Sequence, residues 1–331
     1  MKLKINTFLV ILLSPYLSNY AQDDSVLLEK IKKMEVSLSS IQYDEENIYT
    51  PDVSFQSFYD ELSPYGEWIQ ISKEEVDEDL KNGEGQGYAF YSIPDENFIF
   101  IWRPGVQDKQ WKPYINGRWE YTTHGWLWVS NYSWGWGPYH YGRWWNSKKY
   151  GWVWLPGYVW APAWVIWKVS DAHIGWCALS PNARWTGEDG IVQYNYKHPD
   201  NQWVFIEKSK FTNDINELSI VSPKENQTII SKSQTVLNLK VENSRVVNYG
   251  PDVWDVEKSS GKTIKQKEIN ISREKAKTSV GDTEVNLYKE NFTKGKPHKI
   301  DRPKKYKKSP KVKKILKKRR FRNLPPRDSR R

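Results

Sequence analysis

Residues 113–119 read Pro-Tyr-Ile-Asn-Gly-Arg-Trp, and residues 125–128 read Gly-Trp-Leu-Trp. The same order returns 25 residues later, as Pro-Tyr-His-Tyr-Gly-Arg-Trp at 138–144 and Gly-Trp-Val-Trp at 151–154. Repetition at a fixed period is typical of proteins assembled from copies of one small supersecondary unit. The repeat therefore decides which architecture we expect.

Two looser copies flank these two. One reads Pro-Ala-Trp-Val-Ile-Trp at 162–167, with Gly-Trp behind it at 175–176. The other reads Pro-Tyr-Gly-Glu-Trp at 64–68, with Gly-Tyr-Ala-Phe at 87–90 as its second half. A step of 49 residues separates this first copy from the next, which we explain by two insertions. The sequence thus contains four repeats.

Each copy predicts a β-hairpin. Trp119 and Tyr121 alternate with charged neighbours, which places both rings on one face of a strand. Trp126 and Trp128 do the same on the following strand, and Gly125 suits the tight connection because glycine adopts positive φ. One hairpin is marginally stable in water, whereas four can share a row of aromatic rings. We therefore predict a mainly β fold, an array of short antiparallel hairpins.

Composition and charge add a polar periphery. The 331 residues include 19 Trp, and 27% of them are charged. The single cysteine, Cys177, excludes an intramolecular disulfide. Residues 294–331 hold 19 Lys or Arg and two acids, which is +17, so the rest of the chain carries −7 of the net +10. A basic tail on an acidic body is typical of an interaction segment.

The N-terminus has the order of a secretory signal. Lys2 and Lys4 precede an apolar stretch at 5–13, and small residues lead to Ala21. The stretch is shorter than the roughly 20 residues that span a bilayer. We expect cleavage after Ala21 and a mature protein in the periplasm, on the outer membrane or outside the cell.

These features divide the chain into five parts. We expect a signal peptide at 1–21, a short helix or stalk at 22–54, the Trp-rich four-repeat β domain at 55–186, a second, partly β region at 187–292, and a disordered basic tail at 293–331.

Several ordered motifs resemble those of a known family. They are the run Phe-Tyr-Asp-Glu-Leu-Ser-Pro-Tyr-Gly-Glu-Trp at 58–68, the run Trp-Gly-Trp-Gly-Pro-Tyr-His-Tyr-Gly-Arg-Trp at 134–144, and Trp-Ala-Pro-Ala-Trp-Val at 160–165 leading to Gly-Trp-Cys-Ala-Leu-Ser-Pro at 175–181. They are similar to a family of exported bacterial proteins of unknown function, most often from Bacteroidetes-like bacteria. The family usually has proline where this chain has Ala178.

That resemblance covers about 55–186, and a weaker echo, Val-Asn-Tyr-Gly-Pro at 247–251, suggests that the second region shares the architecture. It implies export and carries no established activity. A looser likeness joins residues 116–121 to the hairpins of choline-binding and glucan-binding cell-wall modules, whose rings form ligand pockets.

Nine repeat residues are candidates for ligand binding, because sugar rings stack on flat aromatic faces. They are Trp119, Tyr121, Trp126, Trp128, Tyr139, Arg143, Trp145, Trp152 and Trp154. The alternative is that the rings form the core. Strand alternation predicts that Trp145 faces away from Trp144, towards solvent or a second layer. It also predicts that Arg118 and Arg143 stack on other rings.

Enzymatic chemistry has weaker support in the sequence. Cys177 follows His173 by four residues, a pair that suggests nucleophilic catalysis, but it lies in an expected core strand. We interpret Cys177 as structural and His140, between two tyrosines, as a packing or hydrogen-bonding residue. The sequence predicts no catalytic residues, no metal site and no cofactor.

The leading hypothesis is a non-enzymatic, structural or scaffolding protein of the cell envelope. The alternatives are a carbohydrate- or peptidoglycan-binding module that uses exposed tryptophans, and a hydrolase with an unrecognised site. The partners we expect are an envelope glycan, or an anionic lipid or lipopolysaccharide contacted through the basic tail; export makes nucleic acid an improbable partner.

Overall fold

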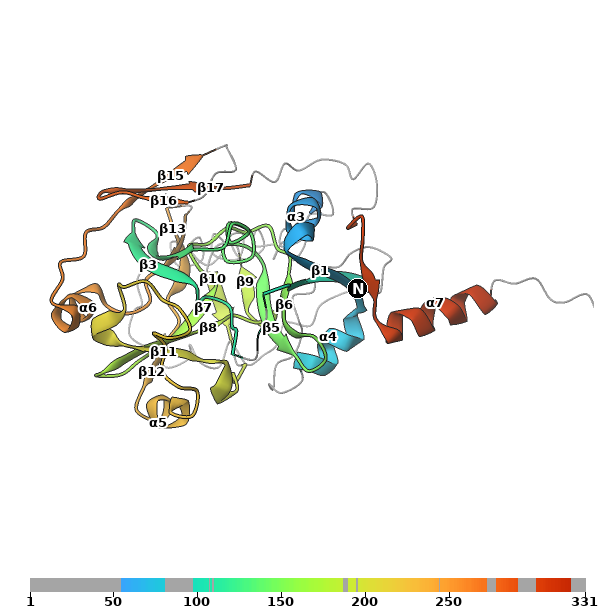
Figure 1. The fold of residues 1–331 in the computed structure, drawn as a ribbon, viewed down its shortest axis with the longest axis horizontal. Helices are drawn as coiled ribbons and strands as arrows, with labels where there is room; N and C mark the ends of the chain where they lie inside the picture. Colours follow the sequence, from blue (N-terminus) through green and yellow to red (C-terminus); the bar gives the residue numbers. More distant parts are fainter. Residues whose placement is uncertain are drawn as a thin grey trace, which may run out of the picture. The chain divides into compact units, whose positions relative to one another are not determined.

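Four antiparallel hairpins carry the Trp-rich repeat (Figure 1). The computed structural model describes residues 55–80, 98–106, 108, 110–186, 190–194, 196–243, 245–272, 278–290 and 302–322. The predicted signal peptide and stalk, and residues 87–90, lie outside the described residues. All described residues belong to one unit that spans residues 48–331.

A pair of tryptophans faces each other across every hairpin. The hairpins are β1 (Gly66–Ser72) with β2 (Phe98–Pro104), β3 (Gly117–Thr122) with β4 (Gly125–Ser130), β5 (Arg143–Ser147) with β6 (Gly151–Leu155), and β7 (Val165–Val169) with β8 (His173–Ala178). The facing pairs are Trp68 and Trp102, Trp119 and Trp128, Trp144 and Trp154, and Trp167 and Trp176. The three later hairpins are confirmed. The prediction for the first copy is wrong in its second half, because β1 pairs with β2 at 98–104 and not with residues 87–90.

The glycine of the repeat makes room for these indoles. Gly66, Gly117 and Gly142 each stand two residues before the first tryptophan of a hairpin. A Cβ added at each would lie within 2.7, 2.9 and 2.7 Å, respectively, of an indole on the opposite strand. Those indoles belong to Trp102, Trp128 and Trp154. The Gly-x-Trp spacing is therefore a packing requirement between neighbouring strands.

Gly142→Ala should destabilise the fold by at least about 2 kcal/mol, because overpacking costs about 1–3 kcal/mol and left-handed backbone adds about 1 kcal/mol. Gly142 has φ +65°, and the new Cβ would be 2.1 Å from the carbonyl oxygen of Leu155. Gly261→Ala is the matched control, because Gly261 has φ +67° with nothing within 4 Å of an added Cβ. Urea unfolding of both variants separates the two contributions; equal losses would contradict the packing role.

The hairpins are distributed over three of the five sheets formed by the described strands. The first and third share a sheet of order β18-β1-β2-β6-β5, in which β18 (Lys307–Lys308) runs parallel to β1. The second hairpin shares a sheet with β13 (Leu239–Glu242) and β14 (Arg245–Asn248), in the order β13-β14-β4-β3. The fourth shares a sheet with β11 (Val204–Glu207) and β12 (Gln234–Val236), in the order β11-β8-β7-β12. The two remaining sheets contain none of these hairpins. One consists of β9 (Arg184–Thr186) and β10 (Gly190–Gln193), and the other of β15 (Glu268–Ser272), β17 (Glu284–Tyr288) and β16 (Ser279–Val280), in that order.

Four strands between residues 204 and 248 complete the sheets of the second and fourth hairpins. β11 (Val204–Glu207) pairs with β8, β12 (Gln234–Val236) pairs with β7, and β14 (Arg245–Asn248), itself paired with β13 (Leu239–Glu242), joins β4. The boundary expected at 186 is therefore crossed by strand pairing. The reason is that the edges of the hairpins need partners for their backbone hydrogen bonds.

The echo of the repeat at 247–251 joins two hairpins. Buried Asn248 accepts a hydrogen bond from Trp167 Nε1 at 2.8 Å and donates one to the carbonyl of Ala163 at 3.1 Å. A Cβ on Gly250 would lie 2.8 Å from the Trp167 ring, so this glycine has the same relation to an indole as the repeat glycines.

One aromatic core and one aliphatic cluster occupy the two faces of the β1-β2-β6-β5 sheet. Trp144 and its facing partners belong to the aromatic core, which reaches from Phe58 to Leu287. Trp145 belongs to the other cluster, with Ile69 and Ile101 among its members. The prediction that Trp145 reaches a second layer is thus confirmed, as period-2 alternation requires.

Short helices cover the sheets. They are α3 (Gln56–Leu62), α4 (Lys73–Leu80), α5 (Asn226–Ser231), α6 (Val253–Ser260) and α7 (Pro310–Arg322), with 3-10 turns η2 (Ser63–Tyr65), η3 (Asp200–Gln202) and η4 (Lys208–Lys210). α4 caps the aliphatic cluster through Val76 and Leu80.

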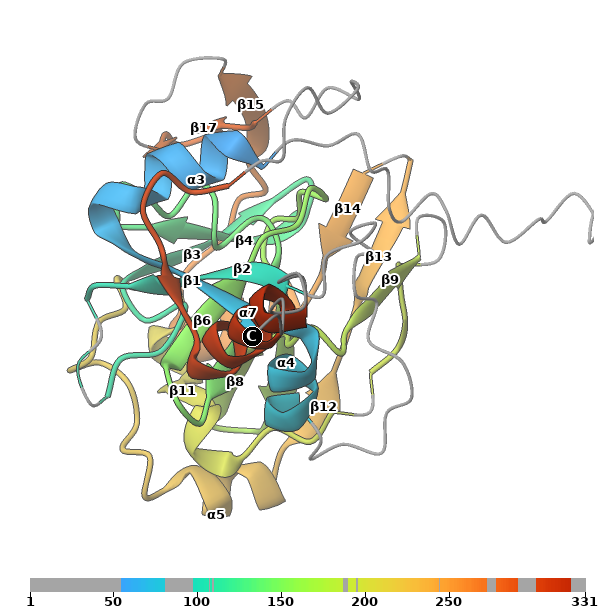
Figure 2. The same ribbon diagram turned by 90° about the vertical axis from the view of Figure 1, so that its right-hand side faces the viewer.

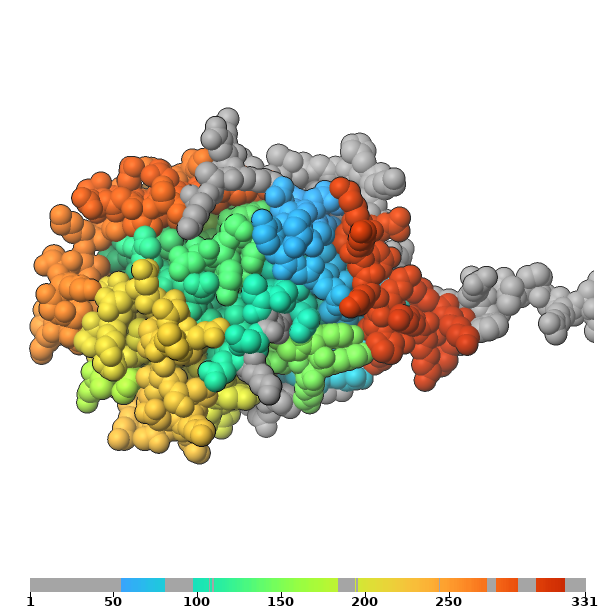
Figure 3. Space-filling model, viewed as in Figure 1, coloured from blue at the N-terminus to red at the C-terminus, as the bar shows by residue number. Residues whose placement is uncertain are grey.

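The structure differs from the expected disordered tail over residues 302–322, which contain β18 and α7. Figure 2 shows α7 beside α4, and Figure 3 shows the C-terminal segment lying against the surface formed by the first described residues. The reason for the difference is local packing: Ser309 and Val312 are buried against the body.

Candidate functional sites

The predicted binding rings lie in the core. Eight of the nine candidates are buried: Trp119, Trp126, Trp128, Tyr139, Arg143, Trp145, Trp152 and Trp154. The ninth, Tyr121, is half-buried and packs on Trp126 with ring centroids 5.2 Å apart. Of the 19 tryptophans, 16 are buried, Trp136 is half-buried and Trp254 is 64% exposed; the side chain of Trp185 lies outside the described part.

Other rings occupy the faces of these indoles. Trp119 lies 4.6 Å from Trp167, 5.0 Å from Trp128 and 5.6 Å from Trp176, measured between centroids. Most of these contacts are tilted or edge-on, the arrangement that the ring quadrupole favours. The repeat therefore brings the predicted rings together in one packed aromatic core, with the exception of Trp145, which lies in the aliphatic cluster on the other face of the sheet.

The two arginines of the repeat behave differently. The Arg143 guanidinium lies 3.5 Å over the centre of the Trp164 ring and donates to the carbonyl of Gly142, so the predicted stacking is confirmed there. Arg118 instead forms an ion pair with Glu120 at 2.7 Å. Glu120 is two residues away on the same face of β3, and this nearby carboxylate outcompetes a ring.

A buried polar chain surrounds Cys177, and sequence reasoning missed its partner. Sγ of Cys177 lies 3.1 Å from Nδ1 of His198, and Nε2 of His198 lies 2.6 Å from the Tyr194 hydroxyl. His173, the partner considered from the sequence, is at the other end of β8. The Cys–His contact joins residues 21 positions apart. No spacing rule in the sequence points to it.

Burial holds this pair in its neutral form. It raises the pKa of the Cys177 thiol and lowers the pKa of His198 to about 4. A reactive cysteine requires a thiolate, which an imidazolium or another cation normally stabilises. Neighbouring Lys112 opposes the shift of Cys177, but burial outweighs it, and Lys112 Nζ donates to the carbonyl of Trp203 at 2.9 Å. The contact is therefore a hydrogen bond between two neutral groups.

Histidines also pack around Trp160. The His140 ring stacks on it at 5.6 Å, and His140 Nδ1 lies 3.1 Å from the carbonyl of Ala161. His124 approaches the indole edge-on at 5.5 Å, and Lys289 Nζ lies 5.3 Å above the ring. The predicted packing role of His140 is thus confirmed. Burial lowers the pKa of His140 to about 4.

One carboxyl pair bears on the hydrolase alternative. A backbone hydrogen bond from Gln110 is the main cause that lowers the pKa of Asp108, and its hydrogen bond with Glu217 adds to this shift. Desolvation is the main cause that raises the pKa of Glu217, and the nearby Asp108 adds to it. Both residues are exposed. Within the described ranges no three His, Cys, Asp or Glu side chains gather as metal ligands. No described helix is long and apolar enough to cross a bilayer.

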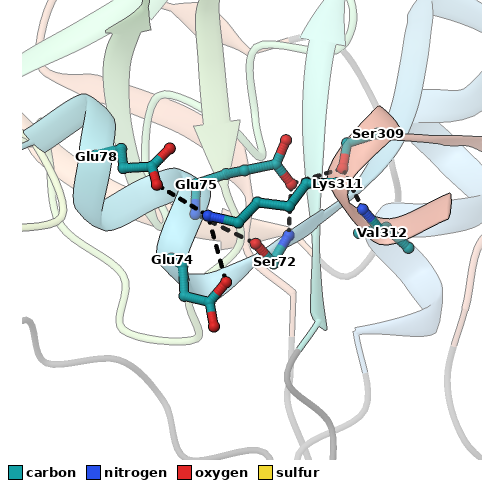
Figure 4. A network of polar contacts seen from close by, with 7 residues as sticks. All are labelled: Ser72, Glu74, Glu75, Glu78, Ser309, Lys311 and Val312. Atoms are coloured by element: carbon teal, nitrogen blue, oxygen red, sulfur yellow. Dashed lines mark hydrogen bonds and ion pairs between the residues drawn. The ribbon is translucent and has the colours of Figure 1, made fainter. Parts of the chain in front are cut away.

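A charged contact joins α7 to α4 (Figure 4). Lys311 Nζ lies 2.9 Å from a carboxylate oxygen of Glu78 and 3.3 Å from one of Glu74. The hydrogen bond to Glu78 raises the pKa of Lys311, and Glu74 adds to the shift. Two more lysines pair along the same edge, Lys307 with Glu67 at 2.5 Å and Lys304 with Asp60 at 3.3 Å.

Two helix caps meet at this contact. Ser72 and Glu75 exchange hydrogen bonds at the start of α4, as in a capping box. Ser309 caps α7, because its Oγ accepts from Val312 N at 3.1 Å. Ser309 Oγ also donates to Glu75 at 2.6 Å, so the two caps share one carboxylate. The acidic residues of α4 thus bind the first turn of α7.

Comparisons place part of this structure among known sequences. Neither the curated proteins nor the solved structures contain a match to the chain. Residues 86–183, which include the strands from β2 to β8, match the model of a family of unknown function (DUF6600).

Proposed function

We propose that this protein is an exported, non-enzymatic structural or scaffolding component of the bacterial cell envelope. The burial of 16 of the 19 tryptophans carries the proposal, because aromatic side chains used as core leave their faces unavailable to a ligand. The neutral, buried Cys177–His198 pair supports the same reading, since it lacks the thiolate of a nucleophilic enzyme.

The basic C-terminal segment is the part that we propose meets other envelope components. Residues 294–331 carry +17, and in the described part of this segment Lys304, Lys307 and Lys311 pair with acids of the body, whereas Lys314 and Lys318 are exposed. The partner in this proposal is an anionic lipid, lipopolysaccharide or an acidic glycan. The carbohydrate alternative that relied on the nine repeat residues loses support, because eight of them are buried.

Export has a direct test in the N-terminal sequence. When the full chain is expressed in a Gram-negative host, the mature protein in the envelope fraction should begin at Gln22 or a near neighbour. Val10→Arg should block processing because it places a charge in the apolar core of the signal. Ser25→Arg, a matched charge beyond the cleavage site, should be processed normally. Mass spectrometry of the N-terminus shows whether each variant is processed. An intact Met1 on the parent protein in the envelope fraction would contradict export.

A further inference from the structure

The C-terminal segment is fixed to the edge of a sheet. β18 pairs with β1, and Ser309 N donates to the carbonyl of Gln70 at 2.9 Å. Tyr306 packs edge-on against Phe100, with ring centroids 4.9 Å apart. Val312, in the first turn of α7, has no exposed surface. These contacts give α7 a defined starting point and direction on the body.

Three lysines of α7 differ in their surroundings. Lys311 is held between Glu74 and Glu78 and its charge is satisfied within the protein. Lys314 and Lys318 are exposed, and among the described residues no acidic side chain pairs with either. They are four positions apart and so lie on one face of the helix. The docking therefore presents an ordered row of cations outwards.

Two aliphatic side chains lie beside the buried face of α7. Ile315 and Leu316 are three and four positions after the buried Val312, so they flank it on the helix, and both remain half-exposed. A helix with lysines and partly exposed aliphatic residues suits a lipid interface, where ammonium groups meet headgroup phosphates and aliphatic groups reach the acyl boundary. An acidic glycan offers negative charge to the lysines but no apolar layer for the aliphatic side chains. The combination favours a phospholipid surface.

We propose that the outward face of α7 binds anionic phospholipid headgroups and that docking on α4 sets the orientation of this face. The inference rests on the proposed envelope location, which brings the helix within reach of such a surface. In this proposal the basic segment binds as a preformed site and not as a flexible polycation, so that the position of each lysine determines binding as well as its charge.

Co-sedimentation with vesicles tests the proposal on the protein purified after export. Vesicles of phosphatidylglycerol and phosphatidylcholine should bind it, and pure phosphatidylcholine should not. Lys314→Gln with Lys318→Gln should weaken binding about 30-fold, since each lysine at an anionic surface contributes about fivefold. Lys304→Gln with Lys307→Gln removes the same charge from lysines that pair with Asp60 and Glu67 and leaves the contact between Lys311 and α4 intact, so we expect a loss below about threefold.

Equal losses in the two double variants would overturn the proposal, because charge alone would then govern binding. Binding of the protein to polygalacturonate but not to anionic vesicles would overturn it in favour of a glycan. Val312→Asn keeps every charge but removes the buried anchor; it should weaken vesicle binding, and unchanged binding would overturn the fixed orientation. Circular dichroism establishes that each variant is folded. A mature N-terminus at Gln22 together with failed vesicle binding refutes this inference alone and leaves the export proposal intact.

Discussion

Trp154→Ala should destabilise the fold by about 3–5 kcal/mol, as large-to-small substitutions of buried aromatic residues do. Trp154 is fully buried, faces both Trp102 and Trp144 across strands, and packs edge-on against Phe58 at 5.1 Å. Its Nε1 donates to the carbonyl of Tyr141 at 2.7 Å, so the substitution also leaves a buried acceptor short of a donor. Such a loss approaches the total stability of many domains, about 5–15 kcal/mol.

Trp254→Ala provides the control for that experiment. Trp254 is 64% exposed and contacts the Lys258 ammonium at 5.0 Å, so its removal should cost less than about 1 kcal/mol. Chemical denaturation, followed by far-UV circular dichroism, compares the two variants with the parent protein. Similar unfolding midpoints for Trp154→Ala and the parent would show that this indole is not part of the core.

Acidification should remove stability between about pH 6.5 and pH 4. Burial lowers the pKa of His140 and of His198 to about 4, below the value near 6.5 expected in the unfolded chain. In that window the unfolded chain binds more protons than the folded one, so the free energy of unfolding falls as the pH falls. Above pH 6.5 both histidines are neutral in the folded and in the unfolded chain, so they no longer make the free energy of unfolding depend on pH.

The expected size of this effect is large. Each buried histidine contributes up to about 1.4 kcal/mol per pH unit, so two of them remove up to about 5 kcal/mol between pH 6.5 and pH 4.5. His124 shifts in the same direction, with a smaller effect because it is partly exposed. Urea unfolding as a function of pH gives the slope directly. His140→Gln with His198→Gln should flatten it, and a parent protein equally stable at both pH values would refute the assignment.

The hairpins could be predicted because their pattern is local. Alternation of rings with polar residues, and glycine at the turns, is sufficient to place β3 with β4 and β5 with β6. The role of Gly142 could not be derived in this way. Its lack of a side chain is required by an indole twelve residues later, and that relation depends on the register of two strands.

The sequence was least informative about long-range polar contacts. The Cys177–His198 pair depends on how the loop before β11 packs on β8, and the link between Asn248 and Trp167 depends on how two sheets pack together. The helix in the basic segment had a local signal, because Ser309-Pro310 is a typical start of a helix. The density of like charge argued for disorder and obscured it; docking against the acids of α4 compensates that repulsion.

The exclusion of water from the tryptophans is the central claim of this account. Iodide quenching of tryptophan fluorescence tests it most directly, because a charged quencher reaches exposed indoles and not a packed core. In the Trp254→Phe variant, iodide should quench the folded protein only slightly, through the few indoles outside the core, and should quench strongly after unfolding in urea. Quenching of the folded variant as strong as that of its unfolded form would contradict a buried aromatic core and restore the tryptophans as candidate binding surface.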